Sequence, residues 1–143
     1  MIKEYISDIC SLLKIKEPSI SYDTSNFTTD TMMAQCNPEG TTIYLNKIDK
    51  PNPDYMFAIA HELRHIWQIK TDCDLYFSKY KPRNLCNSVE EYNLQIAEVD
   101  ANAFAAIIMI NCFHLKPQWN GLSDKVVTSI NDRINTIVHS LSL

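Results

Sequence analysis

The segment Ala58–Trp67, with the sequence AIAHELRHIW, decides how the rest of the chain is interpreted. His61 and His65 are four residues apart, so in a helix they share one face and both imidazoles reach a single cation at about 2.0–2.1 Å. Glu62 is rotated about 100° from His61, which places its carboxylate beside such an ion rather than on it. The spacing therefore predicts a helix that carries two metal ligands and a general base.

The plain alternative is a charged helix face on which the two histidines belong to no site. The residues on both sides of the motif are apolar, which predicts a buried helix, and buried imidazoles need partners. Two histidines do not complete a catalytic zinc site, because such a site takes three protein ligands and a water. We therefore expect a third ligand, a carboxylate or a histidine, on a neighbouring rigid element.

The third ligand is sought in the helix that follows Ser88–Glu91, whose sequence SVEE is a capping box and predicts a helix through about residue 111. Glu98 lies in the middle of this predicted helix, next to small residues that allow close packing. We expect Glu98 to be the third zinc ligand, with Asp100, rotated about 200° from it, as the fallback. Asn102, one turn after Glu98, is predicted to hydrogen-bond the outer ring nitrogen of a ligand histidine and so to orient it.

Hydrophobic periodicity and helix-breaking residues divide the remaining chain into short elements. In chain order we expect a helix at 2–14, a strand at 19–23, hairpin strands at 31–37 and 41–46, and helices at 53–70, 88–111 and 123–141. Asn52 and Ser123 are the expected N-caps of two of these helices, and residues 71–87 are expected to be irregular. The order predicts an α+β fold in a single domain, residues 1–143: an N-terminal helix, a three-stranded sheet with a hairpin, the motif-bearing helix and two further helices.

Composition excludes several classes of protein. The chain has 143 residues, 45% hydrophobic and 21% charged, which is typical of one globular domain. Its two glycines are too few for a dinucleotide fingerprint or a P-loop, and its five cysteines contain no CxxC pair. The net charge of −4 argues against a nucleic-acid partner. With no recognisable signal peptide or membrane span, we expect a cytoplasmic protein, of bacterial or phage origin.

A family resemblance rests on HELRH at 61–65 together with EVDANAFA at 98–105. This pair resembles the zincin pattern HExxH followed by a helix with the sequence E-x-[ED]-A-[ND]-x-F-A. It is similar to small bacterial and phage ImmA/IrrE-like metallopeptidases and, more distantly, to other gluzincins. The resemblance implies a minimal zincin-like metallopeptidase domain in which His61, His65 and Glu98 bind Zn²⁺ and Glu62 is the catalytic base.

The expected activity is zinc-dependent hydrolysis of peptide bonds, with Glu62 taking a proton from the attacking water and passing it to the leaving amine. A peptide or protein substrate, which can be one specific protein, would add as a strand to the hairpin at 31–46; the alternative is that the hairpin only covers the motif-bearing helix. A donor for the oxyanion is also needed, and the sequence does not choose among four candidates. These candidates are Tyr76, Tyr80, Tyr92 and His114.

Two other functions compete with this interpretation. One is a catalytically silent, metal-binding regulatory protein with the same fold, which the retained Glu62 argues against. The other is a nuclease or another zinc hydrolase, which the acidic composition disfavours. We expect neither a nucleic acid nor a membrane as partner, and the oligomeric state is left open.

Overall fold

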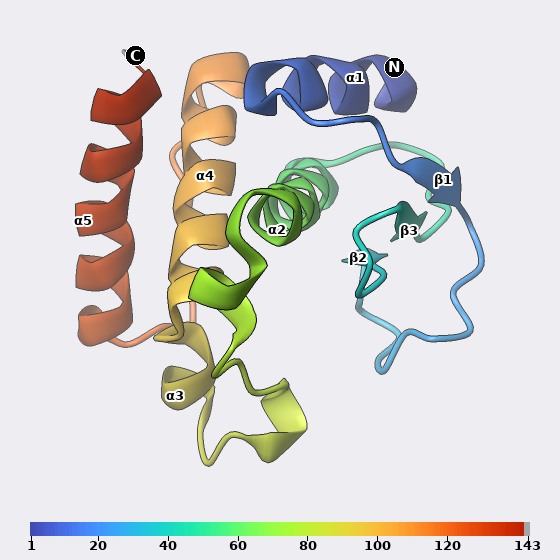
Figure 1. Cartoon of the computed structure of the whole chain (residues 1–143). Coiled ribbons are helices and arrows are strands. Elements are labelled where there is room, and N and C mark those ends of the chain that lie inside the picture. The colour runs from blue at the N-terminus through green and yellow to red at the C-terminus, as the bar shows by residue number, and fades with distance from the viewer. Residues whose placement is uncertain (142–143) are drawn as a thin grey trace. The chain divides into compact units, whose positions relative to one another are not determined.

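Within residues 1–141, which the structure describes, the computed structural model of the protein contains five α-helices, one 3₁₀ helix and three strands (Figure 1). The elements are α1 (Ile2–Leu13), β1 (Ser19–Ser21), β2 (Ala34–Cys36), β3 (Thr42–Leu45), α2 (Pro53–Phe77), η1 (Arg83–Leu85), α3 (Val89–Asn93), α4 (Ile96–Phe113) and α5 (Asp124–Leu141). This content confirms the α+β class and the three-stranded sheet that the sequence predicts.

The chain divides into two compact units, unit 1 at Met1–Asp72 and unit 2 at Cys73–Leu143. The boundary falls at Asp72, where the backbone of α2 leaves helical geometry (φ −156°, ψ 77°). The predicted end of the motif-bearing helix near residue 70 corresponds to this break. The prediction that residues 71–87 are irregular is wrong in part, because α2 resumes after the break as far as Phe77 and η1 follows.

The sheet of unit 1 has the strand order β1-β3-β2, with β1 parallel and β2 antiparallel to the central β3. The predicted hairpin is confirmed, and its turn closes with Gly40 donating its N–H to the carbonyl of Asn37 at 3.0 Å. Gly40 adopts φ 70°, a conformation that favours glycine. A Cβ atom there would lie 3.4 Å from the Ile69 side chain, so this turn packs closely on α2.

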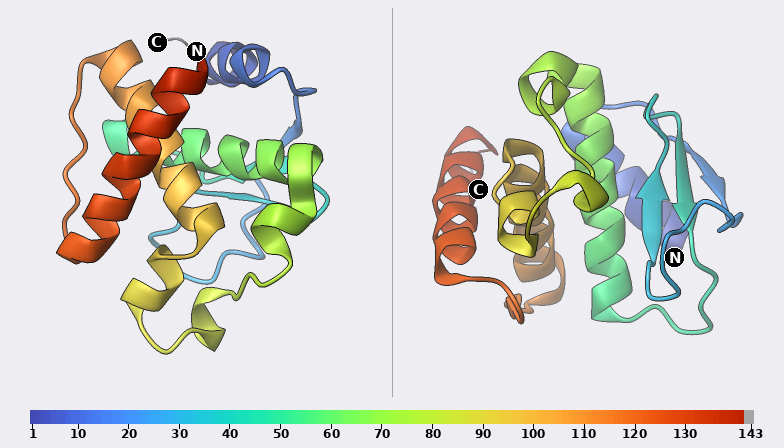
Figure 2. Two further views of the ribbon diagram at one scale, coloured as in Figure 1. Left: turned by 60° about the vertical axis from the view of Figure 1, so that its left-hand side comes forward. Right: turned by 90° about the horizontal axis from the view of Figure 1, so that it is seen from below.

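The core of unit 1 lies between the sheet, α1 and the first part of α2 (Figure 2). Two tyrosine hydroxyls connect these layers: Tyr5 donates to the carbonyl of Met56 at 2.8 Å, and Tyr55 donates to that of Asn46 at 2.9 Å. The expected N-cap is confirmed, since Asn52 accepts the N–H of Tyr55 at 2.9 Å. Fully buried apolar side chains come from all three layers: Ile6 from α1, Ile43 and Leu45 from β3, and Ile59, Leu63 and Ile66 from α2.

In unit 2 the predicted helix at 88–111 is two helices, α3 and α4, and the prediction of one continuous helix is therefore wrong. The N-cap half of the predicted capping box forms, because Ser88 accepts the N–H of Glu91 at 3.0 Å, but the Glu91 carboxylate accepts the N–H of Asn87 instead of that of Ser88. The chain turns at Gln95, which has extended backbone angles and whose side-chain amide bonds both the N–H and the carbonyl of Lys81, at 2.7 and 2.9 Å. Glu98 consequently lies in the first turn of α4 rather than in the middle of a helix.

The core of unit 2 is formed by α4 and α5, which lie side by side and run in the same direction because the connection at 114–123 returns along α4 (Figures 1 and 2). Val126, Ile130 and Ile137 form the buried face of α5, and the predicted cap is confirmed by Ser123 accepting the N–H of Val126. By length and composition alone α4 is apolar enough to cross a membrane, but 61% of it is buried, as in the core helix of a soluble protein.

Candidate metal centre

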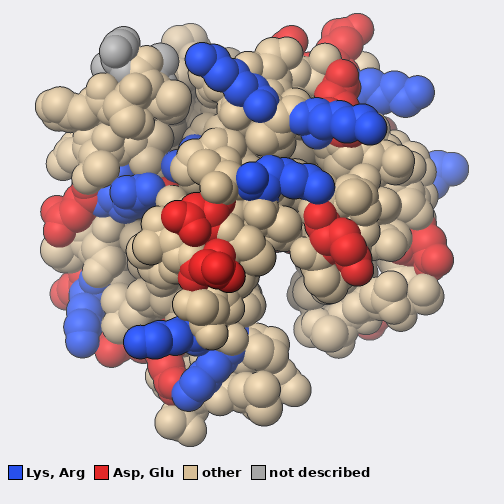
Figure 3. Space-filling view, viewed as in Figure 1, with Lys and Arg blue, Asp and Glu red and all other residues tan. Residues whose placement is uncertain are grey.

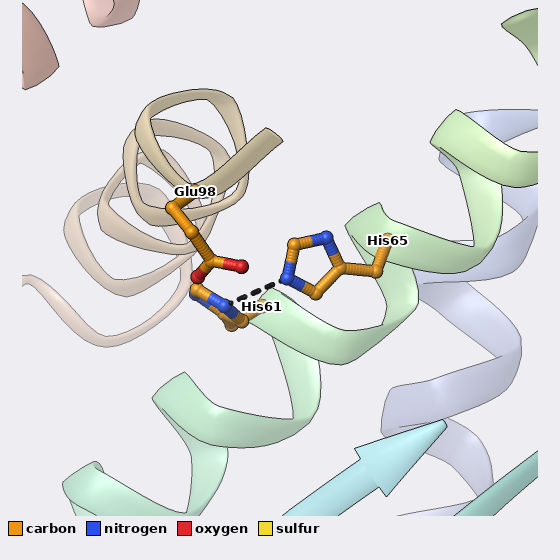
Figure 4. A group of neighbouring side chains, drawn as sticks. All are labelled: His61, His65 and Glu98. Carbon is orange, nitrogen blue, oxygen red and sulfur yellow. Dashed lines mark hydrogen bonds between the residues drawn. The ribbon is translucent and has the colours of Figure 1, made fainter. Parts of the chain in front are cut away.

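The two histidines of the motif face each other on α2, as the spacing predicts (Figure 4). Their Nε2 atoms are 3.0 Å apart, and the ring centroids are 4.6 Å apart at an interplanar angle of 85°. Two nitrogens bound to one tetrahedral zinc ion at about 2.0–2.1 Å would be about 3.3–3.4 Å apart. The histidine pair of unit 1 therefore needs to open by only a few tenths of an ångström to accept such an ion.

The tautomer of His65 is set by Gln68, a residue that the sequence analysis did not single out. Gln68 is fully buried, and its Oε1 lies 2.8 Å from Nδ1 of His65. A carbonyl oxygen only accepts hydrogen bonds, so Nδ1 carries the proton and Nε2 of His65 keeps its lone pair. Ligand histidines commonly donate their outer N–H in this way. The position of Gln68 three residues after His65 on the same helix face was the available signal.

Glu62, the predicted base, lies at the side of the histidine pair. Its Oε1 accepts the main-chain N–H of Cys36 at 2.9 Å, and its Oε2 lies 3.9 Å from Nε2 of His61. The side chains of Glu62 and His61 are each 16% exposed, whereas His65 is buried. A carboxylate held in this way can accept a proton from a water next to the histidines.

Glu98, the predicted third ligand, belongs to unit 2 and is 2% exposed. Its carboxylate accepts the hydroxyl proton of Tyr80 at 2.7 Å, and the Tyr80 hydroxyl also lies 3.1 Å from that of Tyr92. Glu98 lies in the first turn of α4, where the partial positive charge of the helix N-terminus is favourable for an acidic side chain. Tyr80 and Tyr92, both candidates for an oxyanion donor, thus lie together at Glu98.

Asp100, the fallback ligand, has a different environment. It is fully buried and accepts Nε of Arg133 from α5 at 2.7 Å, while the same guanidinium lies 3.3 Å from the Tyr76 hydroxyl. Asp100 therefore takes part in the contact between α4 and α5, and Tyr76, near the end of α2, bonds the same arginine. This arrangement favours Glu98 over Asp100 as the ligand and favours a packing role for Tyr76.

The two remaining predicted residues occupy other positions on α4. His114 is exposed and ends the helix with φ 54°, sixteen residues after Glu98, which is about 24 Å along the helix axis. That distance excludes His114 as an oxyanion donor at an ion bound by Glu98. Asn102 is 9% exposed, and its predicted hydrogen bond to a ligand histidine stays a prediction.

Comparison with known proteins finds no matching family model, no matching curated protein and no matching solved structure. The resemblance to zincins therefore stays a prediction that depends on the motif residues. A function for this site has to be argued from the donors, the distances and the burial described above.

Proposed function

We propose that the protein is a zinc-dependent metallopeptidase with a zincin-like site. The observation that carries the proposal is the arrangement on α2: two imidazole nitrogens 3.0 Å apart, one with its lone pair fixed by Gln68, and Glu62 beside them. Two histidines and one carboxylate are the donor set of several catalytic zinc sites, in which a fourth position stays open. Zinc is favoured over magnesium or calcium because imidazole suits zinc and the harder ions take oxygen ligands.

We infer that Glu98 is the third ligand. In support, unit 1 offers two imidazole nitrogens at His61 and His65, and unit 2 offers the buried carboxylate of Glu98. The carboxylate of Glu98 is almost fully buried, and a buried negative charge needs compensation by a cation or by hydrogen bonds.

The bound ion would lower the pKa of a water molecule toward about 7 and polarise the carbonyl of the scissile peptide bond. Glu62 would take the proton from that water and deliver it to the leaving amine. The N–H of Cys36 keeps the carboxylate of Glu62 in one orientation during both transfers. Gln68 holds the ring of His65 through Nδ1, so Nε2 is the nitrogen that would bind the ion.

A peptide substrate is favoured by the position of β2 at the edge of the sheet. Met33 and Asn37 bond to the strand beside them, so the main-chain groups of Ala34 and Cys36 point to the outer side, where Glu62 is bound. An extended peptide that added to this edge would pass next to Glu62. On the face drawn in Figure 3, Lys and Arg side chains of the described residues lie among Asp and Glu side chains, and the formal net charge of the chain is −4, which is unfavourable for binding a nucleic acid.

The proposal is tested by measuring zinc content and peptide hydrolysis for the wild type, His61→Ala and Glu62→Gln. We expect about one zinc ion per chain in the wild type and loss of this zinc in His61→Ala, because two ligands hold an ion less tightly than three. Glu62→Gln should retain zinc and lower kcat by about 10²–10⁴-fold, because the amide cannot accept the proton.

The same experiment separates the peptidase from a catalytically silent metal-binding protein. Zinc binding that depends on His61, with no hydrolysis of a peptide library by the wild type, would favour the silent protein. Equal hydrolysis by the wild type and Glu62→Gln would contradict the mechanism. A wild type that binds no zinc would contradict the proposed metal site.

A further inference from the structure

Tyr80 lies beside the first turn of α4, and its neighbours hold it there. Its neighbour Lys81 is bonded through both main-chain groups to the side chain of Gln95, three residues before Glu98. The ring of Tyr80 lies against Phe77 and Tyr92, at centroid distances of 5.3 and 6.3 Å. The backbone and the ring of Tyr80 are therefore both held relative to the helix that carries Glu98.

The hydrogen bonds at Tyr80 have one direction. A carboxylate only accepts, so the single hydroxyl proton of Tyr80 is donated to Glu98, over 2.7 Å. The oxygen of Tyr80 can then only accept from Tyr92, whose hydroxyl is 3.1 Å away. The chain of donation runs from Tyr92 to Tyr80 to Glu98.

We propose that Tyr80 is a positioning residue for Glu98, which it holds in the orientation needed to bind the metal, and that Tyr92 holds Tyr80 in turn. This inference rests on the proposed metal site. A glutamate side chain rotates about several bonds, and a ligand carboxylate that is hydrogen-bonded loses less freedom when the ion arrives. Because its proton is already donated to Glu98, Tyr80 acts through this carboxylate rather than on the substrate.

The test compares Tyr80→Phe with Tyr55→Phe in the full chain. Both substitutions keep the ring and remove one donated hydrogen bond, but the hydroxyl of Tyr55 donates to a main-chain carbonyl of unit 1. We expect Tyr80→Phe to bind zinc about 10–100-fold more weakly in competition with a chelator. The visible absorption of the cobalt-substituted variant should also shift, because the carboxylate geometry changes. Tyr55→Phe should alter neither measurement.

Tyr92→Phe is the second variant, and it decides the matter if Tyr80→Phe fails to fold. Because Tyr80 remains, we expect a weaker effect in the same direction, a few-fold loss of zinc affinity. Unchanged zinc affinity and cobalt spectrum in the folded Tyr80→Phe protein would overturn the inference. A lower kcat with unchanged zinc affinity would overturn it too, since Tyr80 would then act on the substrate. If the wild type binds no zinc, the proposed function is contradicted, and the inference about Tyr80, which rests on it, is contradicted as well.

Discussion

Two carboxylates, one in each unit, are held by different kinds of donor. Glu62 of unit 1 accepts a main-chain N–H from Cys36 in β2, whereas Glu98 of unit 2 accepts the side-chain hydroxyl of Tyr80. A main-chain donor is present whatever side chain occupies the position, except proline. A side-chain donor is lost with a single substitution. The orientation of the proposed base thus depends on the fold of the sheet, and that of the proposed ligand depends on the identity of one residue.

Asp100 extends this comparison, because it is a second buried carboxylate on α4 that depends on a side-chain partner. Its donor is Arg133, which joins α5 to α4 at 2.7 Å. Glu98 and Asp100 are only two residues apart, yet they face different partners because α-helical neighbours at this spacing point in different directions. Asp100 therefore contributes to stability, whereas Glu98 stays the proposed metal ligand.

The largest effect on stability should come from Arg133→Met. This substitution leaves the fully buried Asp100 without its cation, and breaking a buried ion pair costs about 3–5 kcal/mol. Because the Arg133 side chain is 31% exposed, we expect the lower end, about 3 kcal/mol, in the free energy of unfolding by urea. Lys125→Met, at an exposed position of the same helix, is the matched control and should change it by about 0.5 kcal/mol or less. Equal stability of the two variants would contradict the role of the ion pair.

An intermediate effect, on catalysis, should come from Cys36→Pro. The N–H of Cys36 points away from β3, so proline removes the hydrogen bond to Glu62 without removing one from the sheet. A hydrogen bond to a charged group contributes about 1.5–3 kcal/mol, so we expect kcat to fall about tenfold or more with zinc content unchanged. Cys36→Ala keeps the N–H and should retain the activity. If Cys36→Ala lowers kcat as much as Cys36→Pro does, the thiol is what matters and the comparison of donors fails.

The smallest effect on stability should come from Cys10, a buried side chain of α1. Unlike the two carboxylates, its thiol is affected mainly by burial and not by a hydrogen-bond donor. Burial, with a smaller contribution from Glu17, raises the pKa of the Cys10 thiol to about 11. The unfolded chain then releases this proton at a lower pH than the folded chain, so stability falls as the pH rises through about 9 to 11. Between pH 8 and pH 10 the free energy of unfolding of the wild type should fall by about 1 kcal/mol more than that of Cys10→Ala. Urea unfolding of both proteins at pH 8, 9 and 10 measures this difference. Parallel pH profiles of the two proteins would show that the thiol is not protected.

Local patterns were sufficient for much of the fold. The hairpin around Gly40 and the caps at Asn52 and Ser123 follow from turn and capping chemistry that acts over a few residues. The pairing of His61 with His65 follows from helical periodicity alone. The prediction of a single continuous helix after Ser88 was wrong because a long-range contact interrupts that helix. Its interruption at Gln95 depends on Lys81, fourteen residues earlier, and no local pattern reports such a contact.

The sequence by itself determined the side chains of the proposed site: two imidazoles and a carboxylate at helical spacing, with a candidate third ligand farther along the chain. Only the tertiary structure decided what holds the two carboxylates, namely the N–H of Cys36 at Glu62 and the hydroxyl of Tyr80 at Glu98. The spacing of His61 and His65 depends only on the geometry of one helix, so it can be predicted from the sequence. The bonds to Glu62 and Glu98 join segments distant in sequence, and their partners are set by packing.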